Sequence, residues 1–246
     1  MKLSILMPVY NEAGTLQAAV KRVLDVSFPC QIELVLVDDA STDSSSEIID
    51  GLPDDPRLTR LRHPVNRGKG AAIRTAAAAA TGDYVIPFDA DLEYQPEEIP
   101  QLVAPVLSGE AEVVYGNRTF GSHSAYSFWY VVGNKGVTMA ANILFNAYIG
   151  DLETCYKLMP LELYRDLGIT SDGFGMEAEI TGKLLARRIR PFEVPISYRA
   201  RSREAGKKIT WRDGVQAVWI LGRIRLAAGR GRSTGRPPAQ GRPSAR

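Results

Sequence analysis

Residues 84–93 read YVIPFDADLE, an apolar run that leads directly into three acidic residues at alternate positions. The apolar part is typical of a buried β-strand, and alternate residues of an extended chain lie on one face. We therefore expect Asp89, Asp91 and Glu93 to converge just beyond the carboxyl end of this strand, where open α/β sheets bind ligands. Carboxylates so close repel one another unless a divalent cation with oxygen ligands lies between them. The stretch predicts either such a metal site or a solvated acidic turn.

Segments of strand and helix character alternate on both sides of this stretch. Apolar runs typical of strands occupy residues 3–7, 33–39, 58–61, 112–116 and 192–198. Apolar spacing and capping residues indicate helices at 13–26, between 43 and 51, at 71–80, from 96 onwards, at 176–188 and at 211–228. This alternation predicts an α/β fold with a Rossmann-like, mostly parallel sheet, flanked by helices and followed by C-terminal amphipathic helices.

The end of the chain differs in composition from the rest. Residues 229–246 include five arginines, no acid and no large apolar side chain. Such a segment cannot bury a core, so we expect one folded domain at 1–228 and a disordered basic tail at 229–246. The formal net charge of the 246-residue chain is only +2. We expect no nucleic-acid partner, and the sequence leaves the oligomeric state open.

The cysteine content and the absence of targeting signals bear on the cellular compartment. Cys30 and Cys155 have neither disulfide nor metal-site spacing, so we expect reduced thiols. The N-terminus becomes polar too soon for a signal peptide. No uninterrupted apolar stretch is as long as the about 18 residues that a membrane-spanning helix requires. These features predict a cytoplasmic protein, in peripheral contact with the inner face of the plasma membrane.

Two segments are rich in apolar and aromatic residues, one at 124–149 and one at 211–228. Lys135 lies near the middle of the first segment, and a central lysine costs a spanning helix roughly 2.5–3.5 kcal/mol on insertion scales, so we reject a transmembrane segment. The second segment places Arg212, Arg223 and Arg225 beside its apolar residues. Both segments are expected either to pack on the domain or to lie at a membrane interface.

Other predicted strand ends also carry polar motifs. PVYNE lies at 8–12, DDASTD at 38–43 and NRGKG at 66–70. No GxGxxG motif follows the first strand and no GxxxxGK[ST] motif is present, which argues against a nicotinamide dehydrogenase and a P-loop NTPase. Together with DADLE at 89–93, in this order and at these intervals, the motifs resemble the family 2 inverting glycosyltransferases of the GT-A fold. This resemblance implies that the domain at 1–228 is catalytic.

Motifs further along the chain narrow the resemblance. YGNR lies at 115–118, DLETCYK at 151–157, FGMEAEI at 174–180, and YRAR at 198–201 is followed by GKK at 206–208. These segments resemble the dolichyl-phosphate mannose synthase-like branch of the family. The resemblance covers residues 3–226, which is nearly the whole chain outside the predicted tail.

Residue roles follow from the resemblance, position by position. The residues that match the pocket for the donor base and ribose are Pro8, Tyr10, Glu12, Val37 and Asp39. Asp89, Ala90 and Asp91 match the diphosphate motif, and Asp89, Asp91 and Glu93 are the implied ligands of Mg²⁺ or Mn²⁺. Arg118, Arg201 and Lys207 match the basic residues that meet donor and acceptor phosphates, with Lys157 as a further acceptor candidate. The implied catalytic residues are Asp89, Asp91 and Arg118.

The implied reaction moves a hexose, mannose or glucose, from GDP-mannose or UDP-glucose to a polyprenyl phosphate by one metal-dependent, inverting displacement. An ionised lipid phosphate needs no proton removed, because its second pKa is about 6. An alternative is transfer to a saccharide hydroxyl, which would need Asp151, Glu153 or Glu177 as a base. A remote alternative is a non-catalytic adaptor that binds membrane or nucleic acid.

Overall fold

The computed structural model describes residues 1–119, 121, 128–200 and 211–232. Within these residues the strands form one sheet in the order β3-β2-β1-β4-β6-β5-β7. The strands are β1 (Lys2–Val9), β2 (Gln31–Asp38), β3 (Leu58–Arg62), β4 (Tyr84–Pro87), β5 (Val114–Asn117), β6 (Lys157–Pro160) and β7 (Phe192–Pro195). The helices are α1 (Leu16–Asp25), α2 (Ser45–Asp50), α3 (Lys69–Ala79), the 3₁₀ turn η1 (Pro96–Glu98), α4 (Ile99–Leu107), α5 (Phe128–Phe145), α6 (Leu161–Asp166), α7 (Gly175–Ala186) and α8 (Trp211–Arg232).

The sheet is mostly parallel, as the sequence predicts. β1 pairs in parallel with β2 and with β4, and β2 pairs in parallel with β3. β6 is the exception, because it runs antiparallel between β4 and β5. β6 was not predicted as a strand, since four residues that begin with a lysine and end with a proline form no recognisable pattern.

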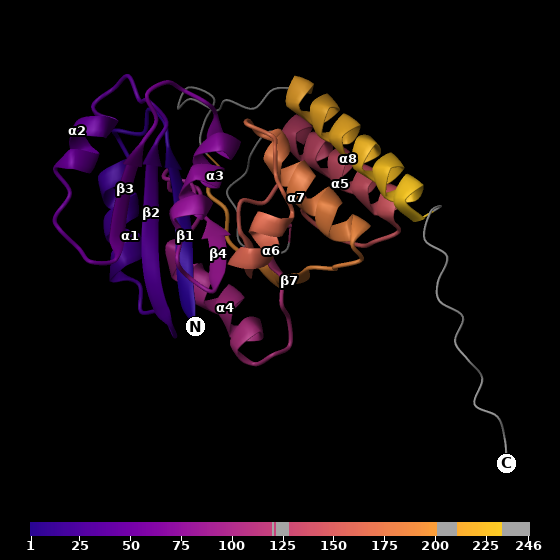
Figure 1. Ribbon diagram of the computed structural model, residues 1–246, viewed down its shortest axis with the longest axis horizontal. Helices are drawn as coiled ribbons and strands as arrows, with labels where there is room; N and C mark the ends of the chain where they lie inside the picture. Colours follow the sequence, from indigo (N-terminus) through magenta and orange to yellow (C-terminus); the bar gives the residue numbers. More distant parts are fainter. Residues whose placement is uncertain (120, 122–127, 201–210, 233–246) are drawn as a thin grey trace, which may run out of the picture.

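Side chains of the central strands alternate between two apolar layers. Leu3, Ile5 and Met7 of β1 pack in one cluster with residues of α1, α2 and α4, whereas Leu6 packs on the opposite face with α3, α6 and α7. Period-two alternation of a fully buried strand explains why its sequence is apolar throughout. Figure 1 shows the sheet between these helices, with α5 and α8 side by side beyond α7.

A third, smaller cluster joins α5, α7 and α8. It includes Val137 and Ala141 of α5, Ala178 of α7, and Ala217 and Leu221 of α8. The amphipathic character predicted for the C-terminal helix is therefore used in part for packing on the domain. α8 continues to Arg232, four residues past the predicted domain boundary at 228, and residues 233–246 lie outside the described part of the chain.

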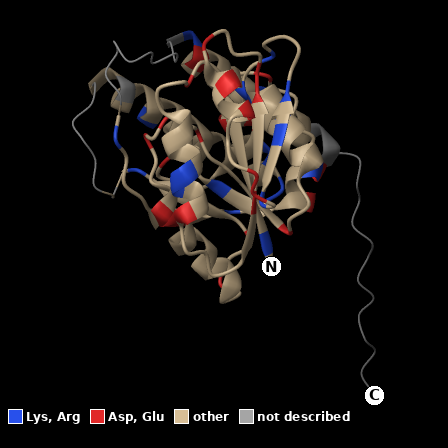
Figure 2. Cartoon of the chain, turned by 90° about the vertical axis from the view of Figure 1, so that its left-hand side faces the viewer, with Lys and Arg blue, Asp and Glu red and all other residues tan. Residues whose placement is uncertain are grey.

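None of the helices described by the structure is long and apolar enough to cross a membrane. Acidic and basic residues are both spread over the described part of the fold (Figure 2).

Candidate active site

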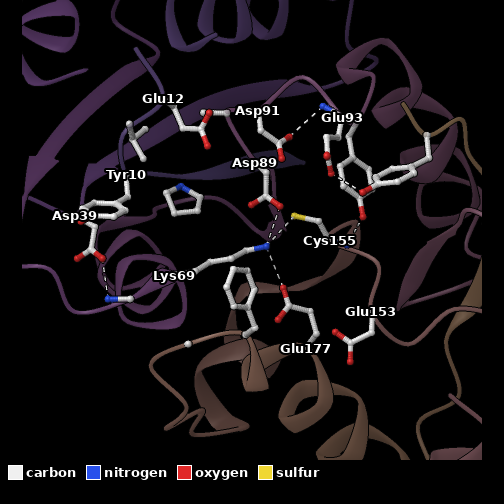
Figure 3. A pocket seen from close by; sticks show the side chains of 18 of the residues that line it. Tyr10, Glu12, Asp39, Lys69, Asp89, Asp91, Glu93, Glu153, Cys155 and Glu177 are labelled. Carbon is white, nitrogen blue, oxygen red and sulfur yellow. Dashed lines mark hydrogen bonds and ion pairs between the residues drawn. The ribbon is translucent and has the colours of Figure 1, made fainter. Parts of the chain in front are cut away.

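A cavity of about 350 Å³ opens at the carboxyl ends of β1, β2 and β4. Its wall is built from loops that are far apart in the sequence, as Figure 3 shows. The lining residues are Pro8, Val9, Tyr10, Glu12, Asp39, Asn66, Gly68, Lys69, Asp89, Ala90, Asp91, Glu93, Tyr94, Arg118, Glu153, Cys155, Gly173, Phe174, Glu177 and Tyr198. Nearly every site residue predicted from the sequence within the described part of the chain is therefore brought to one cavity.

The loop after β4 does not arrange its three carboxylates as one metal site, contrary to the prediction. β4 ends at Pro87, and Leu92 has a left-handed backbone with φ of 60°, so residues 88–93 are not an extended strand. Asp91 Oδ1 accepts a hydrogen bond from the backbone N–H of Glu93 at 3.0 Å. The Tyr198 hydroxyl donates a short hydrogen bond to Glu93 Oε2. Among the described residues, no group of three His, Cys, Asp or Glu side chains is arranged to hold a metal ion. The predicted three-carboxylate metal site is therefore corrected: all three residues line the cavity, but the Glu93 carboxylate accepts a hydrogen bond from Tyr198.

Lys69 supplies a cation between two acidic side chains of the cavity. Its Nζ lies 2.8 Å from Asp89 Oδ2 and 3.1 Å from Glu177 Oε1. Burial opposes the positive charge, but the attraction of Asp89 and Glu177 outweighs it and holds the lysine pKa well above its ordinary value. The ammonium group thus neutralises Asp89 from inside the protein. The sequence predicts for Lys69 only contact with an anion, and does not predict these two partners.

The position of Lys69 is set by a close approach of two backbones. Asp172, just before α7, accepts hydrogen bonds from the N–H groups of Gly70 at 2.7 Å and Ala71 at 3.2 Å. A Cβ atom at Gly70 would lie 2.2 Å from the carbonyl oxygen of Ser171, so only glycine fits there. The NRGKG motif therefore joins the start of α3 to the loop that precedes α7.

Asp39 organises the loop at the other end of the cavity. Its carboxylate accepts hydrogen bonds from the backbone N–H groups of Arg67 at 2.9 Å and Gly68 at 2.7 Å. His63 Nδ1 donates to Asp39 Oδ1 at 2.7 Å, and Nε2 of the same ring lies 2.8 Å from Thr75 Oγ1. Asp39 is therefore largely engaged within the protein. Sequence reasoning assigned nothing to His63, because a lone histidine carries no spacing signal.

Val37 does not line the cavity, contrary to the prediction. It lies one residue before the end of β2, and its fully buried side chain packs in the cluster beneath α3. In a strand that is covered on both faces, a side chain one position from the rim points into a layer of the core. Pro8, Tyr10, Glu12 and Asp39 do line the cavity.

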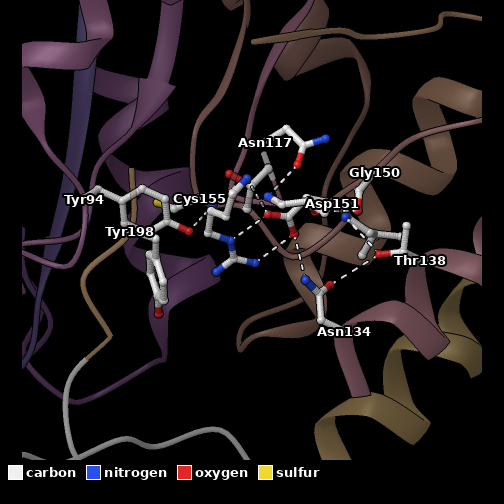
Figure 4. Close-up of polar contacts among 12 residues, drawn as sticks. Tyr94, Asn117, Asn134, Thr138, Gly150, Asp151, Cys155 and Tyr198 are labelled. Atoms are coloured by element: carbon white, nitrogen blue, oxygen red, sulfur yellow. Dashed lines mark hydrogen bonds and ion pairs between the residues drawn. The ribbon is translucent and has the colours of Figure 1, made fainter. Parts of the chain in front are cut away.

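Arg118, which follows β5, is fixed by an ion pair with the buried Asp151. Figure 4 shows the polar surroundings of Asp151. Its Nε and Nη2 donate to the two carboxylate oxygens of Asp151 at 2.6 and 2.8 Å. Asn134 Nδ2 donates to the same carboxylate at 2.9 Å, and the guanidinium lies 4.9 Å from the centre of the Tyr198 ring. Burial alone would raise the Asp151 pKa, but the adjacent Arg118 charge lowers it below its ordinary value. Asp151 is thereby a weak proton acceptor, and its carboxylate is engaged by Arg118 and Asn134.

Glu153 and Lys157 differ in their environments although they are close in sequence. Burial, with the nearby Glu177 charge second, raises the pKa of Glu153 to about 7. Lys157 is turned inward and donates to the carbonyl oxygens of Leu152, at 2.8 Å, and Thr154. Its predicted contact with an acceptor phosphate is corrected, because its ammonium group is used to close the turn before β6. Arg201 and Lys207 lie outside the described residues.

Solved structures define the class of fold. Glucosyl-3-phosphoglycerate synthase from Mycobacterium tuberculosis, crystallised with Mn²⁺, uridine diphosphate and phosphoglyceric acid, matches with a TM-score of 0.64 at 20% sequence identity. The match covers 92% of this chain and 78% of that one. The predicted GT-A type of α/β fold is confirmed.

Residues 4–168 match the family described as Glycosyl transferase family 2, and the chain belongs to this family, as its motifs indicate. Low-salt glycan biosynthesis hexosyltransferase Agl6 of Haloferax volcanii is 29% identical over 207 residues, covering 82% of this chain and 49% of that relative. Dolichol-phosphate mannosyltransferase of Pyrococcus furiosus is 28% identical over 215 residues, covering 85% of this chain and 61% of that relative. The chain thus spans about half to three-fifths of these relatives.

Proposed function

We propose that the protein transfers a hexose from a nucleotide-sugar, GDP-mannose or UDP-glucose, to a polyprenyl phosphate. The observation that carries this proposal is that one cavity is lined by Tyr10, Glu12 and Asp39 together with Asp89, Asp91 and Arg118. Polar, acidic and basic groups within one cavity are what a nucleoside, a diphosphate and an acceptor phosphate require. The named activity of the Pyrococcus relative supports the same acceptor class.

A divalent cation, Mg²⁺ or Mn²⁺, fits the acidic part of the cavity. Asp89 and Asp91 both line it and offer the carboxylate oxygens that such ions prefer. The Mycobacterium structure was crystallised with Mn²⁺, which supports this choice. When bound, the ion would stabilise the negative charge that develops on the departing diphosphate. Lys69 and Arg118 would add positive charge that is fixed in place before the reaction.

The acceptor phosphate is assigned to the Arg118 side of the cavity. Asp151 engages Nε and Nη2 of Arg118, whereas Nη1 takes no part in that pair. An ionised phosphate monoester attacks the anomeric carbon without losing a proton. One direct displacement of this kind inverts the anomeric centre.

A saccharide hydroxyl acceptor is the second candidate, and Glu153 is the observation that favours it. Its pKa of about 7 suits a general base near neutral pH. Asp151 is held by Arg118, and Glu177 is paired with Lys69, so Glu153 is the best-placed base among the three considered.

The acceptor test combines product analysis with a pH profile. With labelled GDP-mannose or UDP-glucose, a divalent cation, and polyprenyl phosphate or a saccharide, we expect label in the lipid extract. Between pH 7 and 9 the rate should stay nearly flat, because the phosphate is already ionised. Labelled saccharide would instead identify a hydroxyl acceptor. In that case the rate should rise as the pH passes through about 7, and Glu153→Gln should lose this rise. Glu162→Gln, an exposed position on α6, serves as the control.

Peripheral contact with a membrane is proposed for the outer side of α5 and α8. Exposed apolar residues recur there at helical spacing: Phe128, Trp129, Val132, Met139 and Ile143 on α5, and Val215, Val218, Trp219 and Leu226 on α8. Arg212 and Arg223 are exposed on α8, and the Arg223 guanidinium lies 4.6 Å from the centre of the Trp219 ring. Aromatic and basic side chains together favour an anionic lipid interface.

A vesicle sedimentation assay checks this contact. We expect the protein to bind vesicles that contain phosphatidylglycerol, and Trp129→Glu with Trp219→Glu to reduce binding at least tenfold, because two aromatic anchors are replaced by charges. Val65→Glu alters an exposed apolar residue in the loop after β3 and should leave binding unchanged. Equal binding by the double variant and the wild type would remove α5 and α8 from the proposal.

A further inference from the structure

We propose that Glu177, together with Glu153, forms the subsite that binds the hydroxyl groups of the donor hexose. This inference rests on the proposed sugar transfer and goes beyond it, because neither the motifs nor the relatives assign a sugar-binding residue. Such a pair would determine which hexose is accepted, whereas the groups at the other end of the cavity would bind the nucleotide.

The first observation is an unsatisfied carboxylate oxygen in the wall of the cavity. Glu177 is 3% exposed, and its Oε1 pairs with Lys69 at 3.1 Å. Its Oε2 is buried and has no hydrogen-bond partner in the part of the chain that the structure describes. A buried carboxylate oxygen without a donor is costly, so its retention in a cavity wall points to a ligand that donates to it.

The position of Glu177 is fixed by the segment that precedes it. The backbone N–H groups of Thr170 and Ser171 donate to the Glu179 carboxylate, the latter at 2.7 Å. Arg74 Nη1 donates to the Ser171 carbonyl oxygen at 2.7 Å, and Asp172 accepts from Gly70. The backbone around Glu177, in the first turn of α7, therefore holds this residue in place. A side chain that selects between similar ligands requires such a fixed position.

The second observation is that Glu153 faces the same part of the cavity. It lines the cavity from the segment before β6, and no hydrogen bond within the described residues engages its carboxyl group. Figure 3 shows the Glu153 and Glu177 side chains as neighbours in the cavity, and the Glu177 charge accordingly contributes to the raised pKa of Glu153. Figure 3 shows both on the side of Lys69 that is opposite Asp39 and Tyr10.

The order of groups along the cavity matches the order of parts in a nucleotide-sugar. Tyr10 and Asp39 lie at one end, Asp89 lies in the middle, and Glu177 and Glu153 follow beyond Lys69 (Figure 3). A hexose carries several hydroxyl donors, and two carboxyl groups offer the acceptors for them. Since Lys69 contacts both Asp89 and Glu177, it links the diphosphate part to the sugar part.

The test compares the binding of nucleotide with that of nucleotide-sugar. Dissociation constants of UDP, GDP, UDP-glucose and GDP-mannose are measured by calorimetry with a divalent cation, for wild type, Glu177→Gln, Glu153→Gln and the exposed control Glu162→Gln. We expect Glu177→Gln to weaken the preferred nucleotide-sugar roughly tenfold or more, which is typical for one hydrogen bond to a charged group, while the diphosphate alone binds within twofold of wild type. A monodeoxy donor that lacks the relevant hydroxyl should bind the wild type less tightly than the natural donor does. In Glu177→Gln the two donors should have equal dissociation constants.

The alternative outcomes separate this inference from the proposed function. Equal weakening of diphosphate and nucleotide-sugar would show that Glu177 acts only through Lys69, and unchanged binding of both would show no contact; either result overturns the sugar subsite. Failure of the wild type to bind any of the four compounds would overturn the transferase proposal itself. Melting curves confirm that each variant is folded, and Glu153→Gln gives a second measurement on the same subsite.

Discussion

Asp91→Asn is expected to abolish sugar transfer, lowering kcat/KM on the order of 1,000-fold. The change removes one of the two carboxylates that line the acidic part of the cavity, and with it a negative charge that a divalent cation needs. The fold should persist, because the amide oxygen of asparagine can still accept the hydrogen bond from the Glu93 N–H. Initial rates at increasing Mn²⁺ or Mg²⁺, with melting curves on the same samples, measure both effects.

A matched control uses an aspartate outside the cavity. Asp54 is fully exposed, so Asp54→Asn should leave transfer and metal dependence unchanged. Full activity of Asp91→Asn in the presence of a chelator would contradict the proposed role of the carboxylates. Activity that recovers at high metal concentration would instead support it, because a weakened site still binds its ion when the ion is abundant.

Asp151→Ala is expected to destabilise the protein by about 3 kcal/mol, because it leaves the largely buried Arg118 without its counter-charge. The side chain of Asp151 is 1% exposed and accepts from Arg118 and Asn134, so one change removes several charge-assisted hydrogen bonds. A loss of this size lowers the melting temperature on the order of 10 °C in a chain of this length. Denaturant unfolding gives the free energy directly.

Two further variants test the physical cause. Asp166→Ala breaks an exposed pair with Arg187 and should cost less than about 1 kcal/mol. Replacing both partners, with Arg118→Met and Asp151→Leu, should be less destabilising than Asp151→Ala, because no unpaired charge is left in the interior. If the double variant were as unstable as Asp151→Ala, the loss would come from packing and not from the unpaired arginine.

The fold was predictable because its information is local. Apolar runs such as residues 33–39 and 84–87 mark strands that are covered on both faces, and helical spacing marks most of the helices between them. The rim of the sheet was predictable for the same reason, since polar residues that follow parallel strands meet at one edge. β6 escaped prediction, because it is four residues long and pairs with strands distant in the sequence.

The sequence predicted most of the residues that form the site, but not which of them pair with one another. Asp89 and Arg118 were expected to face ligands, yet each first meets a protein partner, Lys69 and Asp151 respectively. These pairs join residues 20 and 33 positions apart, and a motif carries no information about such distances. Glu93 lines the cavity as expected, but its bond from Tyr198 was not foreseen, and the extended geometry assumed for the loop ends at Pro87. Glu177 was considered only as a base, since nothing in the sequence shows an unsatisfied oxygen.

The backbone junction at Gly70 has a consequence for how this chain could be altered. The cavity wall that holds Asp39 and Asp89 belongs to the first part of the chain, whereas Glu177 belongs to a segment that follows residue 168, where the family match ends. The two parts meet through main-chain atoms, Gly70 N–H and the Asp172 carbonyl, as well as through side-chain pairs such as Lys69 with Glu177. We therefore expect that a segment 170–186 exchanged from a related enzyme, if it keeps the main-chain contact at Gly70, would replace one wall of the cavity while the wall with Asp39 and Asp89 stays intact.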